Sequence, residues 1–325
     1  MIIIKAMNTF ALPDTTSWQG ATTLGHLAPI VAEGLDAATF LHGQLSQDMQ
    51  NLPQGEARHA AYCSPKGRML ADALVFRPSP EQFVLLMDAG VLPAALKRLQ
   101  MFVMRSKAKL SDARASQALV GLVGAQTIGQ IAPLPAQAYE VTALSDGASL
   151  IRLPDVLGLA RAIWSGPIGR VAGLLGAAPA LDESRWRWLE VMSGIPHIET
   201  ATVDQFVPQM VNFEIIGGIN FKKGCYPGQE VVARSQYRGT LKRRLHLAHS
   251  AELASAGQEV FSADDPGQPA GLVVNVAAVP GGQGSTLLME LKLQHAASAL
   301  TLGAPDGPAL ALGALPYEIP AQDAD

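Results

Sequence analysis

A lone cysteine between two glycines and beside two lysines has the clearest chemical potential in this chain. Cys225 lies in residues 222–230 (KKGCYPGQE), just before a predicted helix. Pro227 suits the first helical position because its φ is fixed, and Glu230 would complement the dipole of the first turn. A thiol at a helix N-terminus near cationic side chains loses its proton more easily. Cys225 is therefore a candidate reactive thiol, and the alternative is a small residue that fills a tight turn.

Basic residues follow the cysteine segment at helical spacing. Arg234, Arg238 and Lys242 recur four residues apart, and Arg243 and Arg244 extend the cluster. On one helix the first three would share a face. This face is either solvated or in contact with an anion. Aromatic residues are sparse nearby, which argues against a platform for single-stranded nucleic acid.

Other kinds of site have little support. The two cysteines are too few for the four thiolates that usually hold an iron–sulfur cluster. His246 and His249 would point to opposite faces of a strand, and the seven histidines show no HExxH spacing. No glycine-rich dinucleotide or Walker-type loop follows a predicted strand. We therefore expect neither a metal site nor a nucleotide cofactor.

The elements that must position these residues are visible as local patterns. Residues 69–104 predict strand, loop, strand and helix, because continuous apolar runs give way to helical spacing. Residues 181–193 predict a second helix, which Asp182 caps and Gly194 ends. From about residue 245, short apolar runs between glycine, proline and aspartate clusters are typical of an all-β barrel or sandwich.

Composition sets the broad class. The chain has 325 residues and 48% hydrophobic content, enough for a sizeable core in two or three domains. A net charge of −4 gives no global attraction to nucleic acid or anionic membranes. No apolar stretch is long enough to span a bilayer, and residues 1–5 are too short for a signal-peptide core. We expect a cytoplasmic monomer without stable nucleic-acid or membrane binding.

The cysteine segment resembles the signature of the YgfZ family, folate-binding proteins related to the T protein (aminomethyltransferase) of the glycine cleavage system. The usual family word is KGCY[TP]GQE, and residues 217–234 contain it complete. The resemblance covers most of the chain and is least distinctive at the C-terminal part. Other segments that resemble family words are residues 40–48, 64–69, 194–196 and 206–212.

The resemblance implies an α+β fold of the aminomethyltransferase-like, folate-binding type. Two related, intertwined α+β subdomains would form residues 1–240, and a C-terminal β-barrel would form residues 241–325. In these families the three parts make a ring, and folate binds in its central channel. Nothing in the periodicity of the sequence shows that ring.

Glu190 matches the place where T proteins carry a pterin-binding glutamate, in a word like LRLEAG. It lies in residues 187–194 (RWLEVMSG). A carboxylate can accept hydrogen bonds from both the ring N–H and the exocyclic NH₂ of a reduced pterin. Many YgfZ-like chains lack an acid here. The alternative is an ordinary exposed glutamate on a helix.

Asp72 matches the second acid of a T-protein word like GGIIDDLIVY, while Ala71 replaces the first. The resemblance places this acid near the reactive nitrogen of folate and in support of aminomethyl transfer. A single acid could stabilise a cationic iminium or act as a base there. The alternative is a strand residue that faces solvent.

The resemblance implies a tetrahydrofolate-binding accessory protein that supports assembly or repair of iron–sulfur clusters in client enzymes, including enzymes that modify tRNA. Tetrahydrofolate or a derivative would be the cofactor, and iron–sulfur client or assembly proteins the partners. Cys225 would act on a damaged or transferred cluster, or form a transient adduct or mixed disulfide. Residues expected to line the site are Lys223, Tyr226, Gln229 and Glu230, with Asn212, Phe221 and Arg234 as weaker candidates.

Two alternative functions stay open. Glu190 and Asp72 favour a folate-dependent aminomethyltransferase, whereas Ala71 and the cysteine word argue against it. A protein-interaction or redox module that does not bind folate is the other alternative. Whether the chain is itself an enzyme is not fixed by the sequence.

Overall fold

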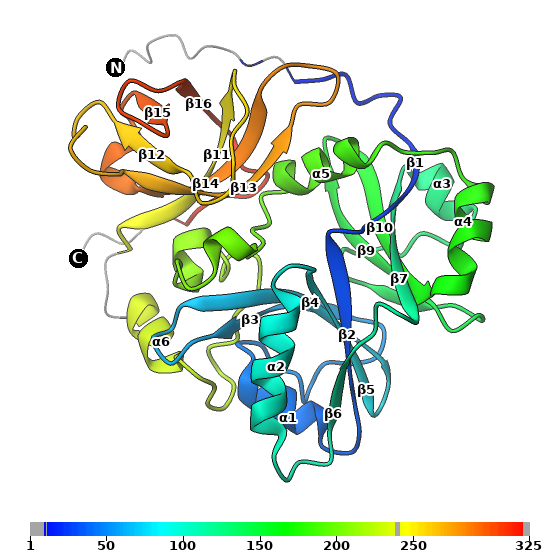
Figure 1. The fold of residues 1–325 in the computed structure, drawn as a ribbon. Coiled ribbons are helices and arrows are strands. Elements are labelled where there is room, and N and C mark those ends of the chain that lie inside the picture. The colour runs from blue at the N-terminus through cyan, green and yellow to red at the C-terminus, as the bar shows by residue number, and fades with distance from the viewer. Residues whose placement is uncertain (1–9, 11, 238–240, 321–325) are drawn as a thin grey trace.

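The computed structural model describes residue 10, residues 12–237 and residues 241–320. Within these residues the chain forms two five-stranded antiparallel sheets and one closed six-stranded barrel. Figure 1 shows the three parts around a common centre, with the barrel at the upper left and the second sheet at the bottom. No helix in the described residues is long and apolar enough to cross a membrane.

The first sheet has helices on its outer face, and a further helix packs against its inner face. The buried sheet residues Val120, Leu150 and Trp164 pack under the outer helices, whereas Leu119 and Ile163 face the centre of the molecule. Its strands, in order across the sheet, are β1 (Gly20–Thr23), β7 (Gln117–Val123), β10 (Leu159–Pro167), β9 (Ser149–Val156) and β8 (Val141–Ala143). The outer helices are α3 (Ala125–Gly129), η1 (Ile168–Arg170) and α4 (Val171–Ala177), and the inner one is α5 (Glu183–Met192).

The second sheet repeats this plan. Its strands, in order, are β3 (Ala57–Cys63), β4 (Met69–Ser79), β5 (Gln82–Asp88), β2 (Leu27–Glu33) and β6 (Lys109–Asp112). Helices α1 (Ala37–Gln44) and α2 (Leu92–Val103) cover its outer face. The expected order of strand, strand and helix across residues 69–104 is confirmed. The chain forms β1 of the first sheet, then all five strands of the second sheet, and then returns to complete the first sheet with β7 to β10. The two subdomains are therefore intertwined.

The C-terminal part is all-β, as the sequence predicts. The barrel closes because β16 pairs with β11. Its strands, in order, are β11 (Arg243–Ser250), β14 (Ser285–Lys292), β13 (Gly271–Ala278), β12 (Glu259–Ser262), β15 (Leu300–Leu302) and β16 (Ala309–Gly313), and η4 (Leu293–His295) follows β14. The predicted boundary at residue 240 borders residues 238–240, which lie outside the described residues, so it stays a prediction.

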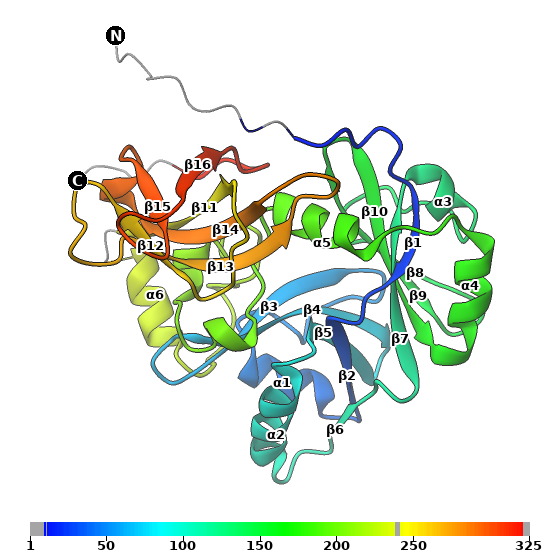
Figure 2. The ribbon, with the colours of Figure 1, turned by 45° about the horizontal axis from the view of Figure 1, so that its top comes forward.

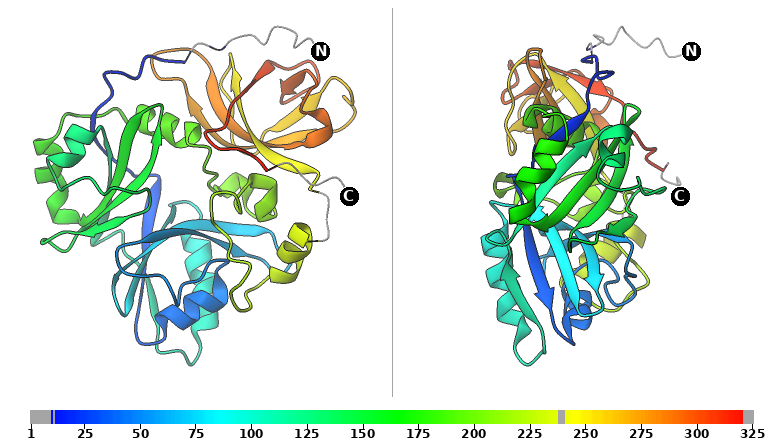
Figure 3. Two further views of the ribbon diagram at one scale, coloured as in Figure 1. Left: turned by 180° about the vertical axis from the view of Figure 1, so that it is seen from behind. Right: turned by 90° about the vertical axis from the view of Figure 1, so that its right-hand side faces the viewer.

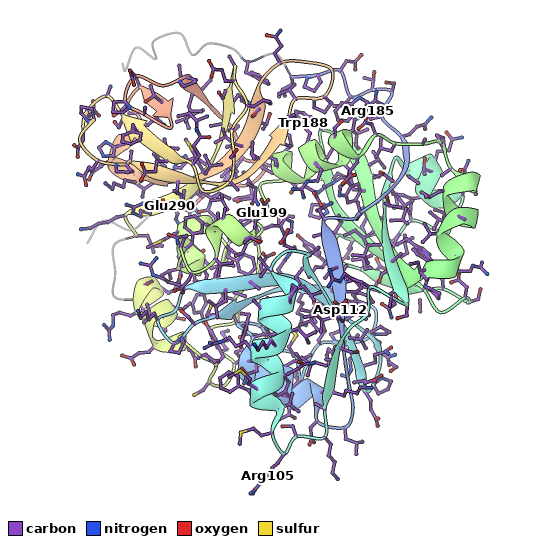
Figure 4. The ribbon with its side chains drawn as sticks, in the orientation of Figure 1. Arg105, Asp112, Arg185, Trp188, Glu199 and Glu290 are labelled. Atoms are coloured by element: carbon purple, nitrogen blue, oxygen red, sulfur yellow. The ribbon has the colours of Figure 1, made fainter. Side chains whose placement is uncertain are left out.

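Helix α5 (Glu183–Met192) joins the first sheet to the barrel. Asp182 caps it by accepting a hydrogen bond from the Ser184 amide at 2.8 Å, which confirms the expected helix start. Trp188 donates to Thr286 Oγ1 in the barrel at 2.9 Å. Figure 4 labels Trp188 at this junction. The helix thereby holds two parts of the fold in a fixed relation.

A mostly irregular segment connects α5 to the barrel and runs past the second sheet (Figure 3). It contains η2 (Thr200–Thr202), η3 (Pro208–Val211) and α6 (Gln229–Tyr237). One buried cluster includes Trp188, Phe213 and Leu288, so both sheets, this segment and the barrel share a core. Figure 2 shows the barrel above the second sheet and beside the first. A channel through this centre stays a prediction.

Candidate functional site

Buried and half-buried polar side chains gather where the three parts meet. Glu190 comes from α5, His26 from the turn before β2, and Asp72 from β4. His197 lies in the segment that follows α5, and Asn275 comes from barrel strand β13. Asp72 and Glu190 are 3% and 8% exposed, so neither is the solvent-facing residue that the alternatives described. Their roles toward a ligand stay predictions.

Glu190 is held by donors on both carboxylate oxygens. Trp186 Nε1 donates to Oε1 at 2.8 Å, and Arg187 Nη1 donates to Oε2 at 3.2 Å. His26 Nε2 lies 3.0 Å from Oε2. Burial opposes the charged form, but the hydrogen bond with His26 and the positive charges of His26, Arg187 and His197 outweigh it, so the pKa of Glu190 falls to about 2. Glu190 is therefore an anion at neutral pH.

Asp72 and His197 form a second pair beside it. Oδ1 of Asp72 accepts from the Ile198 amide at 2.6 Å, and Oδ2 lies 3.0 Å from His197 Nδ1. Burial disfavours the charged imidazole, but the charge and hydrogen bond of Asp72, with the charge of Glu190, raise the pKa of His197 to about 9. His197 thus contacts Asp72 directly and also interacts with the charge of Glu190.

The barrel fixes the position of His197 through an amide clamp. Asn275 Oδ1 accepts from the His197 amide, and Asn275 Nδ2 donates to the His197 carbonyl, both at 2.8 Å. Nδ2 also donates to Glu199 Oε1 at 2.8 Å. Asn275 follows a register shift in β13, which is a common way to re-aim a side chain. Figure 4 places Glu199 at the meeting point of the three parts.

Two cavities flank this group. Arg187, Glu190, His197 and Glu199 line a narrow one. His59 lines a larger one of about 800 Å³, together with Arg58, Tyr139, Glu56 and Gly217. Burial lowers the pKa of His59 to about 4; the charge of His197 acts in the same direction, and that of Asp72 opposes it. Asp72 and His197 are therefore close to both cavities.

Arg161 is a functional candidate that sequence reasoning missed. The side chain is 1% exposed and lies over the Trp186 ring. Burial lowers its pKa to about 10, against the charges of Glu190, Tyr139 and Asp155. Nε and Nη2 reach the Pro154 carbonyl at 3.3 Å, and Nη1 has no partner among the described residues. An arginine within the apolar run of β10 is the signal that could have found it.

Cys225 is exposed and lies in the turn before α6. The helix begins at Gln229, so the expected place of Pro227 at the first helical position is wrong. Gly228 turns the chain first, with a φ of 81°, and a Cβ there would lie 2.4 Å from the Ser64 carbonyl oxygen. Glu230 does lie in the first turn, as predicted.

Lys223 attaches the cysteine turn to the end of α1. Its Nζ donates to the carbonyls of His42 and Leu45, the latter at 2.7 Å, and lies 4.9 Å from the Tyr226 ring centroid. Burial lowers the pKa of Lys223 to about 8, while the charges of Asp48 and Cys225 oppose this shift. Tyr226 is buried. Among the described residues, no hydrogen bond or ion pair joins this turn directly to Glu190 or Asp72.

The remaining predicted site residues lie apart from the charged group. Glu230 and Arg234 pair with each other at 2.7 Å on the exposed face of α6. Phe221 packs edge-on against Tyr237, and Gln229, half-buried, starts the helix. Asn212 is fully buried, and its side chain bonds both backbone groups of Leu245. Their ligand roles stay predictions.

The expected basic stripe on one helix is wrong. Helix α6 is described as far as Tyr237, and Arg238 lies outside the described residues. Lys242 is not helical and directly precedes β11, so it does not share a helical face with Arg234. Arg243 and Arg244 enter β11 and pair with Glu290 and Glu214. No group of three or more His, Cys, Asp or Glu side chains in the described residues is placed to hold a metal ion.

Gly121 should be needed for the position of Trp186 and hence of Glu190. A Cβ on Gly121 would lie 2.6 Å from the Trp186 ring. Gly121→Ala is expected to destabilise the protein by about 1–3 kcal/mol through overpacking, measured by urea unfolding. Gly173 is exposed in α4, and a Cβ added there would have no surrounding atom within 4 Å. Gly173→Ala should therefore be neutral or stabilising by up to about 1 kcal/mol. Equal stability of the two variants would contradict the packing argument.

Comparison with known proteins defines the class first. The fold is that of the glycine cleavage T proteins: the aminomethyltransferase T structure from Bartonella henselae aligns with a TM-score of 0.73 and 17% identity, covering 92% of this chain and 86% of that one. This confirms the predicted α+β aminomethyltransferase-like fold with a C-terminal barrel. No family model matches the chain.

Sequence relatives then identify the family. The tRNA-modifying protein YgfZ of Klebsiella pneumoniae (strain 342) is 32% identical over 237 residues, 69% of each chain. That of Vibrio vulnificus (strain YJ016) is 27% identical over 252 residues, 78% of this chain and 75% of the relative. An uncharacterized protein of Haemophilus influenzae is 32% identical over 234 residues, 71% of this chain and 74% of the relative. The chain belongs to the YgfZ family.

Proposed function

We propose that the protein binds tetrahydrofolate or a derivative where its three parts meet. With this ligand, it supports assembly or repair of iron–sulfur clusters in client enzymes, including enzymes that modify tRNA. The observation that carries the folate part is the buried Arg161–Glu190–His197–Asp72 group, which is an expensive arrangement for a purely structural core. The iron–sulfur part rests on family membership and on the exposed Cys225 in a complete KGCYPGQE segment.

Glu190 fits a pterin edge on one condition. Both of its oxygens already accept hydrogen bonds from the protein. Arg187 is the donor that can leave, because its side chain is 31% exposed and also lies 3.7 Å from Glu199. Departure of Arg187 would free one acceptor position on Oε2, which His26 still contacts, and would widen the narrow cavity that Arg187 lines. Glu190 would then exchange one guanidinium donor for pterin N–H donors, while its contacts with Trp186 and His26 remain.

Arg161 and the larger cavity supply the rest of the fit. The unpartnered Nη1 of Arg161 can donate to a carbonyl or carboxylate oxygen, both of which a folate carries. Arg161 lies over the ring of Trp186, and the same ring donates to Glu190, so the guanidinium is near the carboxylate that would hold the pterin. The cavity lined by Tyr139 and His59, at about 800 Å³, has room for a ligand of this size. Tetrahydrofolate would supply a reduced pterin and its reactive nitrogens to this site.

We expect anaerobic calorimetry to show saturable binding of tetrahydrofolate to the wild type. Glu190→Gln should weaken that binding by about tenfold or more, because a charged acceptor is lost from a buried hydrogen-bond pattern. Glu259→Gln, at an exposed position of barrel strand β12, is the matched control and should bind normally. Cys225→Ser should also bind normally if the cysteine serves partners rather than the ligand. If the wild type did not bind tetrahydrofolate, the proposal that the protein binds folate would be wrong.

An aminomethyltransferase is the second candidate, and Asp72 is the observation that favours it. Its carboxylate is fixed by Ile198 and His197 in an arrangement able to support a developing positive charge. Formation of methylenetetrahydrofolate from an aminomethyl donor, lost in Asp72→Asn, would decide for this candidate. Binding without turnover would favour the accessory role.

A further inference from the structure

A histidine and an aspartate lie beside the cysteine turn and have no part in the folate site. His42, in the last turn of α1, places Nδ1 3.0 Å from Asp48 Oδ1. Its other ring nitrogen, Nε2, faces the turn, since it lies 3.6 Å from the position of a Cβ on Gly224. Cys225 is the next residue. The order of groups is therefore carboxylate, imidazole and thiol-bearing turn.

The aspartate is itself held in place. Asn51 donates to Asp48 from its backbone amide at 3.1 Å and from Nδ2 at 2.8 Å. These bonds and the His42 contact lower the pKa of Asp48, although burial opposes them. An ionised Asp48 accepts a hydrogen bond from the Nδ1–H of His42, which leaves Nε2 as the acceptor in the neutral ring. This tautomer is the one that could take a proton from a thiol.

Lys223 holds the turn against this pair. Its ammonium bonds the carbonyl of His42 itself and that of Leu45, so the cysteine turn and the end of α1 are joined at the same residue. Asp48 contacts the His42 ring and Lys223 bonds the His42 carbonyl, so the aspartate, the imidazole and the cysteine turn lie side by side. Lys222, next in the chain, is exposed. Cys225 thus stands in an accessible, electropositive turn with a histidine–aspartate pair beside it.

We propose that His42 is the proton acceptor for Cys225 and that Asp48 positions its ring, so that Cys225 enters thiol–disulfide exchange with a partner as a thiolate. This inference rests on the reactive cysteine of the proposed function, but it does not require folate. Nucleophiles activated by an adjacent base, which a third group orients, follow the same logic on unrelated folds.

The exchange balances without an added oxidant. The Cys225 proton moves from Sγ to His42 Nε2. The thiolate then forms a bond with one sulfur of the partner's disulfide as the S–S bond breaks. The second sulfur leaves as a thiolate and receives the proton from His42. The product is a mixed disulfide, which a second thiol can resolve by the same chemistry.

Alkylation by iodoacetamide tests this proposal on the full-length, folate-free protein. The rate at Cys225 is followed by peptide mass spectrometry from pH 6 to 9, and buried Cys63, whose pKa is raised to about 12, is the internal unreactive thiol. We expect His42→Gln to react about tenfold more slowly than wild type at pH 7 and equally fast at pH 9. Asp48→Asn should fall between them. His246→Gln, in the barrel, should match the wild type.

The pH profile separates proton transfer from a structural effect. Equal rates for wild type and His42→Gln at pH 7 would overturn the proposal. A variant that is equally slow at pH 7 and pH 9 would overturn it too, because that pattern indicates blocked access. Free imidazole should restore the pH 7 rate of His42→Ala if the ring supplies only a base. A protein that shows this dependence but binds no folate would retain the inference and lose the folate part of the function.

Discussion

Glu214→Leu is expected to cost about 3–5 kcal/mol of unfolding free energy, the largest single effect that we predict. Arg244, in β11, is 5% exposed and pairs with Glu214, which belongs to the segment that connects α5 to the barrel. Nη1 of Arg244 also donates to the Gln209 carbonyl at 3.1 Å. Removal of Glu214 leaves a guanidinium buried at this joint without a counter-charge, and arginine cannot release its proton.

Removal of the other partner, in Arg244→Met, should cost less unfolding free energy. Burial raises the pKa of Glu214, and the hydrogen bond and charge of Arg244 counter that shift. In Arg244→Met the carboxyl can therefore take up a proton and remain buried as a neutral group. The double variant Glu214→Leu/Arg244→Met should recover much of the loss, because a buried ion pair adds little over apolar residues of similar volume.

Urea unfolding of the two single variants and the double variant measures this cycle. The exposed pair Arg234–Glu230 on α6 is the matched control, with side chains 66% and 84% exposed. Glu230→Ala should change stability by about 0.5 kcal/mol or less. A loss for Glu214→Leu as small as that of the control would show that the buried joint does not depend on charge.

Local elements of this fold could be predicted because their signals are local. Asp182 before an amphipathic run, with Gly194 after it, contains most of the information for α5. Alternating short apolar runs likewise predicted the barrel strands. The non-helical position of Lys242 was missed because four-residue spacing alone does not show how far a helix continues. Arg243 and Arg244 instead satisfy buried acids in the barrel region.

The charged group at the centre could be predicted only in part. A family resemblance pointed to Asp72 and Glu190, but neither position revealed its partners. Asp72 and His197 are 125 positions apart in the chain, and their contact depends on how the second sheet meets the barrel. A sequence pattern indicates which face of a helix or strand is buried. It does not indicate which buried faces of different elements contact each other. The link through His197 therefore came from the structure.

A stability loss between pH 6.5 and 9 is the expected signature of the His197–Asp72 pair. The ordinary pKa of 6.5 applies to His197 in the unfolded chain, and the folded value is about 9. A raised folded pKa stabilises the protein fully below the unfolded value, and this stabilisation is lost as pH rises through the folded value. The contribution is about 3 kcal/mol at most. Unfolding midpoints in urea, measured from pH 6 to 10, would follow it.

His197→Gln isolates this contribution from other titrating groups. Glu190, with a pKa of about 2, stays charged throughout this range, and His59, with a pKa of about 4, stays neutral in the folded state. Lys223 acts in the opposite direction above pH 8, because its folded pKa is depressed to about 8. Lys223 is present in both proteins, so it cancels when the variant's curve is subtracted from that of the wild type.

Asp72→Asn tests the cause of the effect. Without the carboxylate, burial and the charge of Arg187 lower the pKa of His197 and only the charge of Glu190 raises it, so most of the alkaline loss should disappear. The wild type should then lose stability from pH 6.5 to 9 relative to both variants. Parallel curves for all three proteins would mean that His197 is not charged beside Asp72. In that case the central group could not hold the alternating charges on which the proposed folate site depends.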